Sequence, residues 1–484
     1  MTGPSTLLAR LRGRRRSPGG QLPERHDEQP TPGGEFNRRL LAPMVLGSVL
    51  NPINSSMIAV ALVPVGAAFG APPAETAWLV TALYLATAVG QPVIGRLVDD
   101  YGPRRLYLAG TALVGLAGVL GALAPSLGVL VVARVLLGLG TSAAYPAAIH
   151  LTRSEAERTG RSSPASVLTV LAVAGQTVAV IGPTLGGLLI GLGGWRTVFA
   201  VNVPLSLICL ALGAARLPAT APRRGREDRL DHAGIALFAI LLLTLMLFVM
   251  KPRTALWYLP VLTVLAAVGF AARETRTRNP FIDLRALARN RPLIATYLRQ
   301  VLGSTGTYAF LYGYTQWLEE GRGLSAASAG LVLLPLSLTG LASAAVTGRS
   351  AAVRGKLVVG SVFQMAACAA LLLLGSTSGV ALLIAVGVLA GIPQGLIGLG
   401  NQSALYHQAD PAAIASAAGL LRTFMYLGAM AASAANAAFF PDGATTAGLH
   451  HLAPFMLGGA ALLFVVILPD RSLGRVGTAA VKPN

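Results

Sequence analysis

Three arginines lie inside long apolar stretches of this sequence, where a charged side chain requires a specific partner. They are Arg134, Arg299 and Arg422, whereas all 19 acidic residues lie in polar segments or close to the end of an apolar stretch. A buried charge without a partner is costly. Backbone carbonyls and water can satisfy these arginines, and Arg299, which is nearest an end, can also extend toward water. Alternatively, they line a polar cavity and bind an anionic ligand, because the guanidinium fork fits carboxylate and phosphate.

A second set of polar residues belongs to a repeated loop. Residues 95–105 and 348–356 both place Gly-Arg seven residues ahead of another glycine, and a basic residue follows closely. In the first loop, Asp99 lies near the predicted start of a helix, where its carboxylate can meet the helix N-terminus and Arg104 and Arg105. The repeat indicates either two ordinary tight turns or two homologous halves of one protein.

Composition indicates the environment of these residues. Hydrophobic residues make up 54% of the 484 positions and charged residues 12%, about half the charged share of soluble domains. Lipid solvates apolar side chains, so a membrane-embedded chain needs fewer charges. The apolar stretches are long and continuous, which predicts helices, and a window of about 19 residues finds fourteen of them. The predicted spans are 41–69, 76–98, 104–123, 126–149, 164–191, 195–215, 232–250, 256–272, 293–318, 325–348, 355–375, 378–402, 412–439 and 450–468.

The basic residues are distributed unevenly about these spans. If the N-terminus lies in the cytoplasm, the inner segments carry 31 of the 38 Lys and Arg residues and the outer loops carry four. This bias predicts that both termini are cytoplasmic. Twelve spans would preserve it too, so the spans at 232–250 and 256–272 rest on hydropathy alone. The arginines are not interleaved with aromatic residues, which argues against nucleic-acid binding despite a net charge of +19.

Several motifs then resemble those of one transporter family, the major facilitator superfamily. Residues 95–105 resemble its signature loop, and Arg134 with Gly138 and Gly140 resembles its fourth-span motif. Residues 182–187 resemble the fifth-span motif of its antiporters. Residues 194–204 and 279–290 resemble stretches of its fourteen-span drug:proton antiporter branch. The resemblance covers roughly residues 40–470.

The resemblance implies an all-α polytopic fold in which two six-helix halves flank two extra helices. The implied divisions are a basic cytoplasmic tail (1–39), a first half (40–216), a linker with two helices (217–292), a second half (293–470) and a C-terminal tail (471–484). It also implies an ion-pair latch at Asp99 and a fifth helix at the interface between the halves of an exporter. The implied gating residues are Gly95, Asp99, Gly102, Arg104, Arg105, Arg134, Gly182, Pro183, Gly186 and Gly187.

Two positions depart from the family pattern. The branch carries an aspartate early in its first span, where this chain has Asn54, and asparagine cannot carry a proton. Span thirteen of the branch carries asparagine near the position of Arg422. We therefore expect a mixed polar and cationic cavity, although any of its residues can instead link helices. The candidate substrate-binding residues are Asn51, Asn54, Gln91, Gln176, Arg299, Gln300, Tyr308, Gln394 and Arg422.

These observations predict a proton-coupled efflux carrier for drug-like or secondary-metabolite molecules. An organic-anion carrier or exchanger that uses Arg299 and Arg422 is the alternative, and a lipid exporter is a third possibility. No nucleophile–base pair or metal-ligand spacing indicates an enzyme, a metal site or a cofactor. We expect a monomer in the inner (cytoplasmic) membrane, with the bilayer and a small-molecule substrate as its partners.

Overall fold

The computed structural model describes residues 37–159, 165–218, 231–250, 254–277, 280, 282, 284–348, 352–409, 414–470 and 472–475. Helices account for nearly all of this part of the chain. Those of the first half are η1 (Arg38–Leu40), α1 (Leu41–Met57), η2 (Ile58–Val60), α2 (Leu62–Phe69), α3 (Pro73–Tyr101), α4 (Pro103–Ala122), α5 (Leu127–Thr141), α6 (Ala144–Thr159), α7 (Ala165–Gly193), α8 (Arg196–Ala200) and α9 (Asn202–Arg216).

A linker and a second half follow. The linker contains α10 (His232–Met250), η3 (Thr254–Leu256), α11 (Tyr258–Glu274) and α12 (Leu284–Arg289). The second half contains α13 (Arg291–Gln316), η4 (Trp317–Gly321), α14 (Ala326–Gly348), α15 (Val353–Ala370), η5 (Leu371–Leu373), α16 (Val380–Gln408), α17 (Ile414–Phe439), α18 (Thr446–Ile467) and α19 (Ser472–Arg475). Of these, η4 is a π-helical turn that continues α13.

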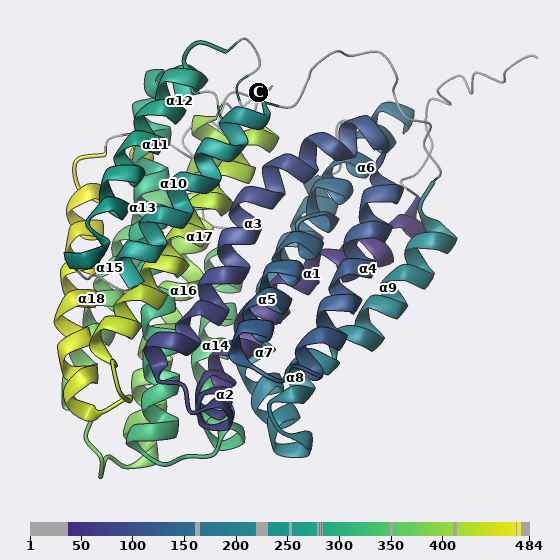
Figure 1. Cartoon of the computed structure of the whole chain (residues 1–484). Helices are drawn as coiled ribbons and strands as arrows, with labels where there is room; N and C mark the ends of the chain where they lie inside the picture. The colour runs from purple at the N-terminus through teal and green to yellow at the C-terminus, as the bar shows by residue number, and fades with distance from the viewer. Residues whose placement is uncertain are drawn as a thin grey trace, which may run out of the picture.

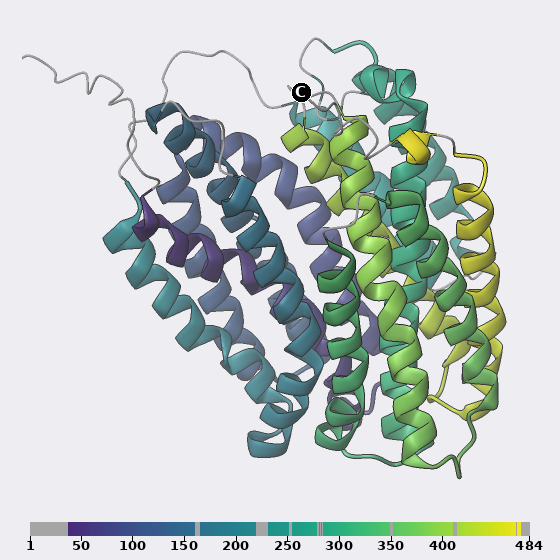
Figure 2. The ribbon, with the colours of Figure 1, turned by 180° about the vertical axis from the view of Figure 1, so that it is seen from behind.

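The two halves repeat one packing scheme. In the first half, α1 packs on α7, α5 packs on α3 and α4, and α4 also packs on α9. In the second half, α13 packs on α17, α16 packs on α14 and α15, and α15 also packs on α18. Corresponding helices therefore meet corresponding partners, which supports the internal repeat expected from the two loops. Figures 1 and 2 show the first half in purple to blue and the second half in green to yellow.

The halves meet along two helix pairs, α7 with α14 and α3 with α17. These pairs are equivalent under the repeat, since each joins the fifth helix of one half to the second helix of the other. The linker helices α10 and α11 pack on each other, and α10 also contacts α3 and α17. We call the end of the bundle at which α2 and α8 lie the α8 end, and the opposite end, with α6 and α12, the α6 end (Figure 1).

Ten helical segments among the described residues are long and apolar enough to cross a membrane. Every predicted span coincides with one helix or with two or three consecutive helices. The segments that fall short of these criteria include α11, which has only 17 residues, and α13, whose sequence is comparatively polar. The chain is therefore a multi-pass membrane protein with an all-helical fold, and the count of fourteen spans stays a prediction.

The signature loop is shorter in the structure than in the prediction. The helix α3 extends to Tyr101, so Asp99 lies in its last turn rather than at the start of the next helix. Gly102 separates α3 from α4 with a φ of 89°, a conformation that favours glycine, and Pro103 begins α4. The loop glycine is thus required by the sharp turn between two long helices.

Candidate functional site

The fifth-span motif lies where α7 meets both α1 and the opposite half. A Cβ added at Gly182 would lie 2.7 Å from the Cβ of Ser56 in α1, and one at Gly186 would lie 2.9 Å from the carbonyl oxygen of Met57. On another face of α7, a Cβ at Gly187 would lie 2.5 Å from the carbonyl oxygen of Ala326 in α14. These glycines therefore permit close approach on two faces of one helix.

The same motif also bonds directly to the second half. The hydroxyl of Thr184 donates a hydrogen bond to the carbonyl oxygen of Gly330, 2.8 Å away. A Cβ added at Gly330 would in turn lie 2.9 Å from the carbonyl oxygen of Pro183. Because α7 ends and α14 begins at the α8 end, this contact holds the halves together there.

The second interface follows one face of α3. Ala77, Tyr84 and Gln91 lie at intervals of seven residues, which places them on one side of the helix. The carbonyl oxygen of Ala77 accepts a hydrogen bond of 2.9 Å from the hydroxyl of Ser433 in α17. Tyr84 stacks on Tyr426 of α17 with ring centroids 5.4 Å apart. These contacts run along the boundary between the halves.

Tyr84 is the centre of a group that we call the tyrosine cluster, made of Tyr84, Tyr308, Tyr312 and Tyr426, of which Tyr308 is partly buried and the others are buried. The hydroxyls of Tyr84 and Tyr312 lie 3.4 Å apart, and the ring of Tyr308 meets that of Tyr84 edge to face. Tyr308 also stacks on Tyr312, one turn further along α13. One tyrosine from the first half is thus enclosed by three from the second. Aromatic faces with hydroxyl groups suit a planar organic ligand.

Arg134 is held by backbone carbonyls next to this cluster. Its Nε donates to the carbonyl oxygen of Leu79 (2.8 Å) and its Nη1 to that of Asn54 (3.0 Å). Its Nη2 lacks a partner among the described residues. Backbone carbonyls therefore satisfy two of the three guanidinium nitrogens of Arg134, as one of the two interpretations of the buried arginines expects. Through these bonds Arg134 links α5 to α1 and α3.

Asn54 is occupied by a neighbour rather than exposed to a cavity. Its amide exchanges two hydrogen bonds with the amide of Asn202 in α9, with distances of 2.6 and 2.9 Å. Asn54 is buried and also donates to the carbonyl oxygen of Leu50. The structure gives this position a role in joining α1 to α9, and we do not retain Asn54 as a substrate-binding residue.

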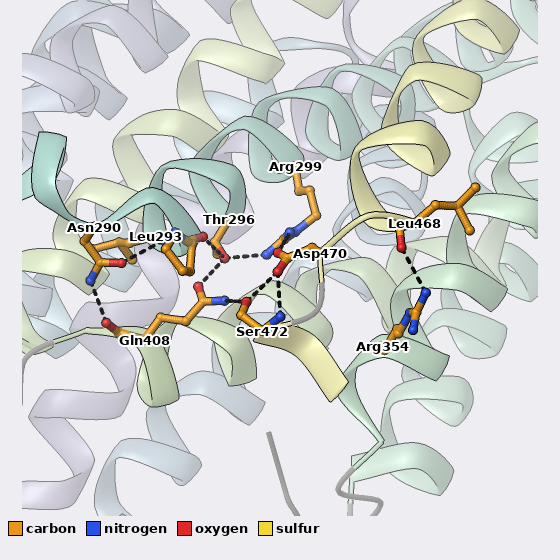
Figure 3. A network of polar contacts seen from close by, with 10 residues as sticks. Asn290, Leu293, Thr296, Arg299, Arg354, Gln408, Leu468, Asp470 and Ser472 are labelled. Carbon is orange, nitrogen blue, oxygen red and sulfur yellow. Dashed lines mark hydrogen bonds and ion pairs between the residues drawn. The ribbon is translucent and has the colours of Figure 1, made fainter. Parts of the chain in front are cut away.

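Arg299 pairs with an acidic residue that lies just beyond the last long helix. Its Nη1 donates to Oδ2 of Asp470 at 2.5 Å, and its Nη2 donates to the hydroxyl of Thr296. Asp470 lies just after α18, and its other oxygen accepts from the hydroxyl and the backbone N–H of Ser472. Figure 3 shows this group, which also contains Gln408 and which we call the Arg299–Asp470 network. Arg299 is fully buried and paired inside the second half, so its substrate-binding role is not carried forward.

Arg422 is in a different situation. Its guanidinium carbon lies 3.4 Å from the ring centroid of Tyr145 in α6, so it bridges the two halves by a cation–π contact. Tyr426 of the tyrosine cluster lies one turn further along α17. No residue that the structure describes forms a hydrogen bond or ion pair with Arg422, and the side chain is only partly buried. Of the three arginines within the predicted spans, Arg422 has the position that best fits a ligand.

The other predicted site residues are dispersed. Asn51 donates to Thr141, and Gln300 links Ser304 and Asn401 inside the second half. Gln394 lines a small cavity within that half. Arg104 donates to the carbonyl oxygen of Ala214 in its own half.

Several predicted residues have no described contact that supports the assigned role. Arg105 is exposed, and a Cβ added at Gly95 would make only ordinary contacts with Pro146. Gln91 is the exception: it is buried at the boundary beside Tyr426 of the tyrosine cluster, with which its side chain forms a hydrogen bond, while its Oε1 has no hydrogen-bond partner among the described residues. The side chains of Asp99 and Gln176 lie outside the described residues, so the predicted latch stays a prediction.

Sequence reasoning missed Tyr84, Tyr145, Tyr312 and Tyr426. Their signal was spacing: Tyr308 and Tyr312 lie one turn apart, as do Arg422 and Tyr426. Polar or aromatic pairs one turn apart within an apolar span share one face, so the face toward the partner half could have been identified.

Known proteins match this chain over most of its length. The model of the Major Facilitator Superfamily matches residues 44–433. The uncharacterized MFS-type transporter YwoD of Bacillus subtilis (strain 168) is 32% identical over 441 residues, covering 88% of this chain and 96% of that protein. The tetracenomycin C resistance and export protein of Streptomyces glaucescens is 28% identical over 422 residues, covering 84% and 77%. A crystal structure of the nucleoside transporter NupG shares the fold, with a TM-score of 0.63 at 10% identity over 89% of this chain and 98% of that chain.

Proposed function

The chain belongs to the major facilitator superfamily, a family of transporters rather than enzymes, and from this premise we propose that it exports drug-like or secondary-metabolite molecules in exchange for protons. The halves rock about their two interfaces, so that the space between them opens to one side of the membrane at a time. The observation that carries the proposal is the placement of the antiporter-like motif at the α7–α14 interface, where Gly187 and Thr184 contact the opposite half.

Two further observations support export of an organic molecule. The tyrosine cluster joins α3 of the first half to α13 and α17 of the second, so rocking of the halves must change its shape. A similar protein is named for resistance to and export of tetracenomycin C. A ligand at this cluster would therefore contact both halves.

Transport into inside-out membrane vesicles tests the proposal. Compounds sorted by charge, with tetracenomycin C among them, are first screened for growth protection in cells that express the chain. Each protected compound is then expected to accumulate in vesicles whose lumen is acidified, and to leak out when nigericin collapses the pH gradient. Accumulation that ignores the gradient and requires a counter-anion would instead make the protein an exchanger.

We also propose fourteen spans in the inner (cytoplasmic) membrane, with both termini in the cytoplasm, the α6 end inside and a monomeric state. The excess of Lys and Arg in the inner segments supports this orientation. Introduced cysteines test it, because the two native ones, Cys209 and Cys368, are buried. A cysteine at Trp257, which is exposed between α10 and α11, is expected to react with an impermeant maleimide from outside. Reaction only from inside would contradict the fourteen-span topology.

Arg422 favours a second candidate, a carrier of organic anions. A guanidinium that is stacked on a ring and unpaired by hydrogen bonds with the described residues can bind a carboxylate without first breaking an ion pair. The aromatic groups beside it, Tyr145 and Tyr426, would hold the rest of an aromatic anion. This candidate differs from the first in the charge of the substrate, not in the fold.

The variant Arg422→Ala separates these candidates. If the substrate is anionic, losing one charge-assisted contact of about 1.5 kcal/mol lowers its transport about tenfold. Transport of a cationic substrate is expected to be unchanged. The control is Arg196→Ala, because Arg196 also stacks on a ring, that of Trp195, but is exposed at the α8 end. Equal losses for anions and cations would show that Arg422 supports the structure only.

A further inference from the structure

A buried carboxyl lies at the α8 end of α13, in the π-helical turn η4. Glu319 is only 7% exposed, and the Oε1 atom of its side chain has no hydrogen-bond partner among the described residues. The next residue, Glu320, is exposed, and its Oε2 accepts a hydrogen bond from the backbone N–H of Ala444. Two adjacent glutamates thus have opposite environments, and π-helical turns of this kind are frequent at functional sites.

Glu319 continues a polar line that starts at the tyrosine cluster. Tyr308, Tyr312, Gln316 and Glu319 follow at spacings of four, four and three residues, which keep to one side of a helix. Gln316 is buried, and its Oε1 also lacks a partner among the described residues. The line runs from the cluster between the halves toward the α8 end. A change in charge at Glu319 can therefore affect the contacts between the two halves through this line of side chains.

Ionisable groups around η4 do not neutralise Glu319. The turn packs against α13, α14 and α18. No ionisable residue occurs in the sequence of α14. Close to η4 in the sequence, in the last turns of α13, or in and just before the first turns of α18, the ionisable groups are Tyr312, Tyr314, Glu320, Arg322, Asp442, His450 and His451. Of the basic residues, Arg322 donates to the carbonyl oxygen of Ser378 and His450 contacts that of Leu374, and the structure shows no ion pair between Glu319 and either.

This environment disfavours the ionised carboxylate. Glu319 lies one residue beyond the predicted span 293–318, and burial, followed by the like charge of Glu320, raises the pKa of its carboxyl. A metal ion is a poor occupant, because the described residues contain no group of three or more His, Cys, Asp or Glu side chains that could hold one. The ligand that best neutralises the carboxylate of Glu319 is a proton.

We propose that Glu319 is the proton-binding carboxyl of this carrier and takes the place of the first-span acid that Asn54 replaces. The assignment rests on the proposed function and orientation. When the α8 end opens to the outside, Glu319 takes up a proton, and closure of that end carries the proton inward. Substrate that enters through the open α6 end then displaces the proton toward the cytoplasm, and the ionised carboxylate favours reopening of the α8 end. The buried carboxyl is stable in the closed state only when protonated, so return of the carrier requires the proton.

Infrared spectroscopy of the purified protein in liposomes tests proton binding without a substrate. We expect the carbonyl band of a protonated carboxyl at neutral pH, which disappears on titration to alkaline pH. The band is expected to be absent in Glu319→Gln and unchanged in Glu320→Gln, the matched control one residue away. An identical spectrum for wild type and Glu319→Gln would overturn the assignment.

Transport then tests coupling in the same proteoliposomes, with a compound from the growth screen. Accumulation driven by a pH gradient is expected to fall at least tenfold in Glu319→Gln, while exchange of labelled for unlabelled compound at equal pH persists. Gradient-driven accumulation by Glu319→Gln at the wild-type rate would reject the assignment of the proton to Glu319 but not the proposed antiport. A wild-type carrier that ignores the gradient would reject the proposed antiport itself, so the two failures are distinguishable.

Discussion

Replacing Asp470 with asparagine is expected to destabilise the second half by about 3 kcal/mol, because it leaves a buried guanidinium without its counter-charge. Arg299 is fully buried, and the Asp470 side chain is 11% exposed. The network around them joins α13, the end of α16 and the segment after α18 (Figure 3), so these elements should loosen together. Thermal unfolding of the purified protein, followed by fluorescence in detergent, measures the loss. The control is Asp442→Asn, which alters an exposed acid and should leave the unfolding temperature unchanged.

Acid should remove the same stabilisation from the wild type. Burial alone would raise the pKa of Asp470, but hydrogen bonds from Ser472 and Arg299 and the charge of Arg299 outweigh it and lower the pKa. A carboxyl with a lowered pKa in the folded state stabilises the fold above its ordinary pKa, 3.8, and ceases to do so as the pH falls through the folded value. Wild type and Asp470→Asn should therefore differ at neutral pH and converge in strong acid. A constant difference across this range would mean that asparagine disturbs packing and not charge.

The pairing of Arg299 with Asp470 could not be predicted from the local sequence. Arg299 lies near the start of α13, and Asp470 follows the last long helix, 171 residues later. Both positions are at the same end of the bundle, which the span count alone predicts. Whether a residue in the segment after α18 folds back under α13 depends on the path of that segment, and hydropathy carries no information on it.

The interface residues show the opposite case, in which pattern was informative. The glycines at 182, 186 and 187 were singled out by their motif, and the structure places them on the faces of α7 toward α1 and α14. Their motif gave no indication of which glycine serves which face, because that depends on the rotation of α7. Asn54 also stood out by type, but its partner Asn202 lies in another helix, 148 residues away. Hydropathy predicted the helices and the two loops predicted the repeat, but only three-dimensional packing identified the residue pairs.

Replacing Gly187 with alanine is expected to slow transport about 30-fold, although it adds one methyl group. That methyl would lie 2.5 Å from the carbonyl oxygen of Ala326 and 3.2 Å from the Cα of Ala327, so backbone atoms must move. Overpacking of this kind costs about 2 kcal/mol, which shifts a two-state equilibrium about 30-fold. Because the contact joins the two halves at the α8 end, the cost is expected to fall on the state in which that end is closed, and the open state gains population.

A second glycine on the same face of α7 provides the control for this prediction. Gly191 lies one turn beyond Gly187, and its added Cβ would make an ordinary contact of 3.5 Å with the Cβ of Ala327, so Gly191→Ala should transport at the wild-type rate. A reporter, Thr184→Cys, places a thiol in the same interface, where the native side chain is buried. Gly187→Ala should raise its labelling by an impermeant maleimide, and Gly191→Ala should not. Slow transport with unchanged labelling would show that the defect of Gly187→Ala does not lie in closure of the α8 end. Unchanged transport would show that α14 shifts to accommodate the methyl group and that Gly187 does not control closure.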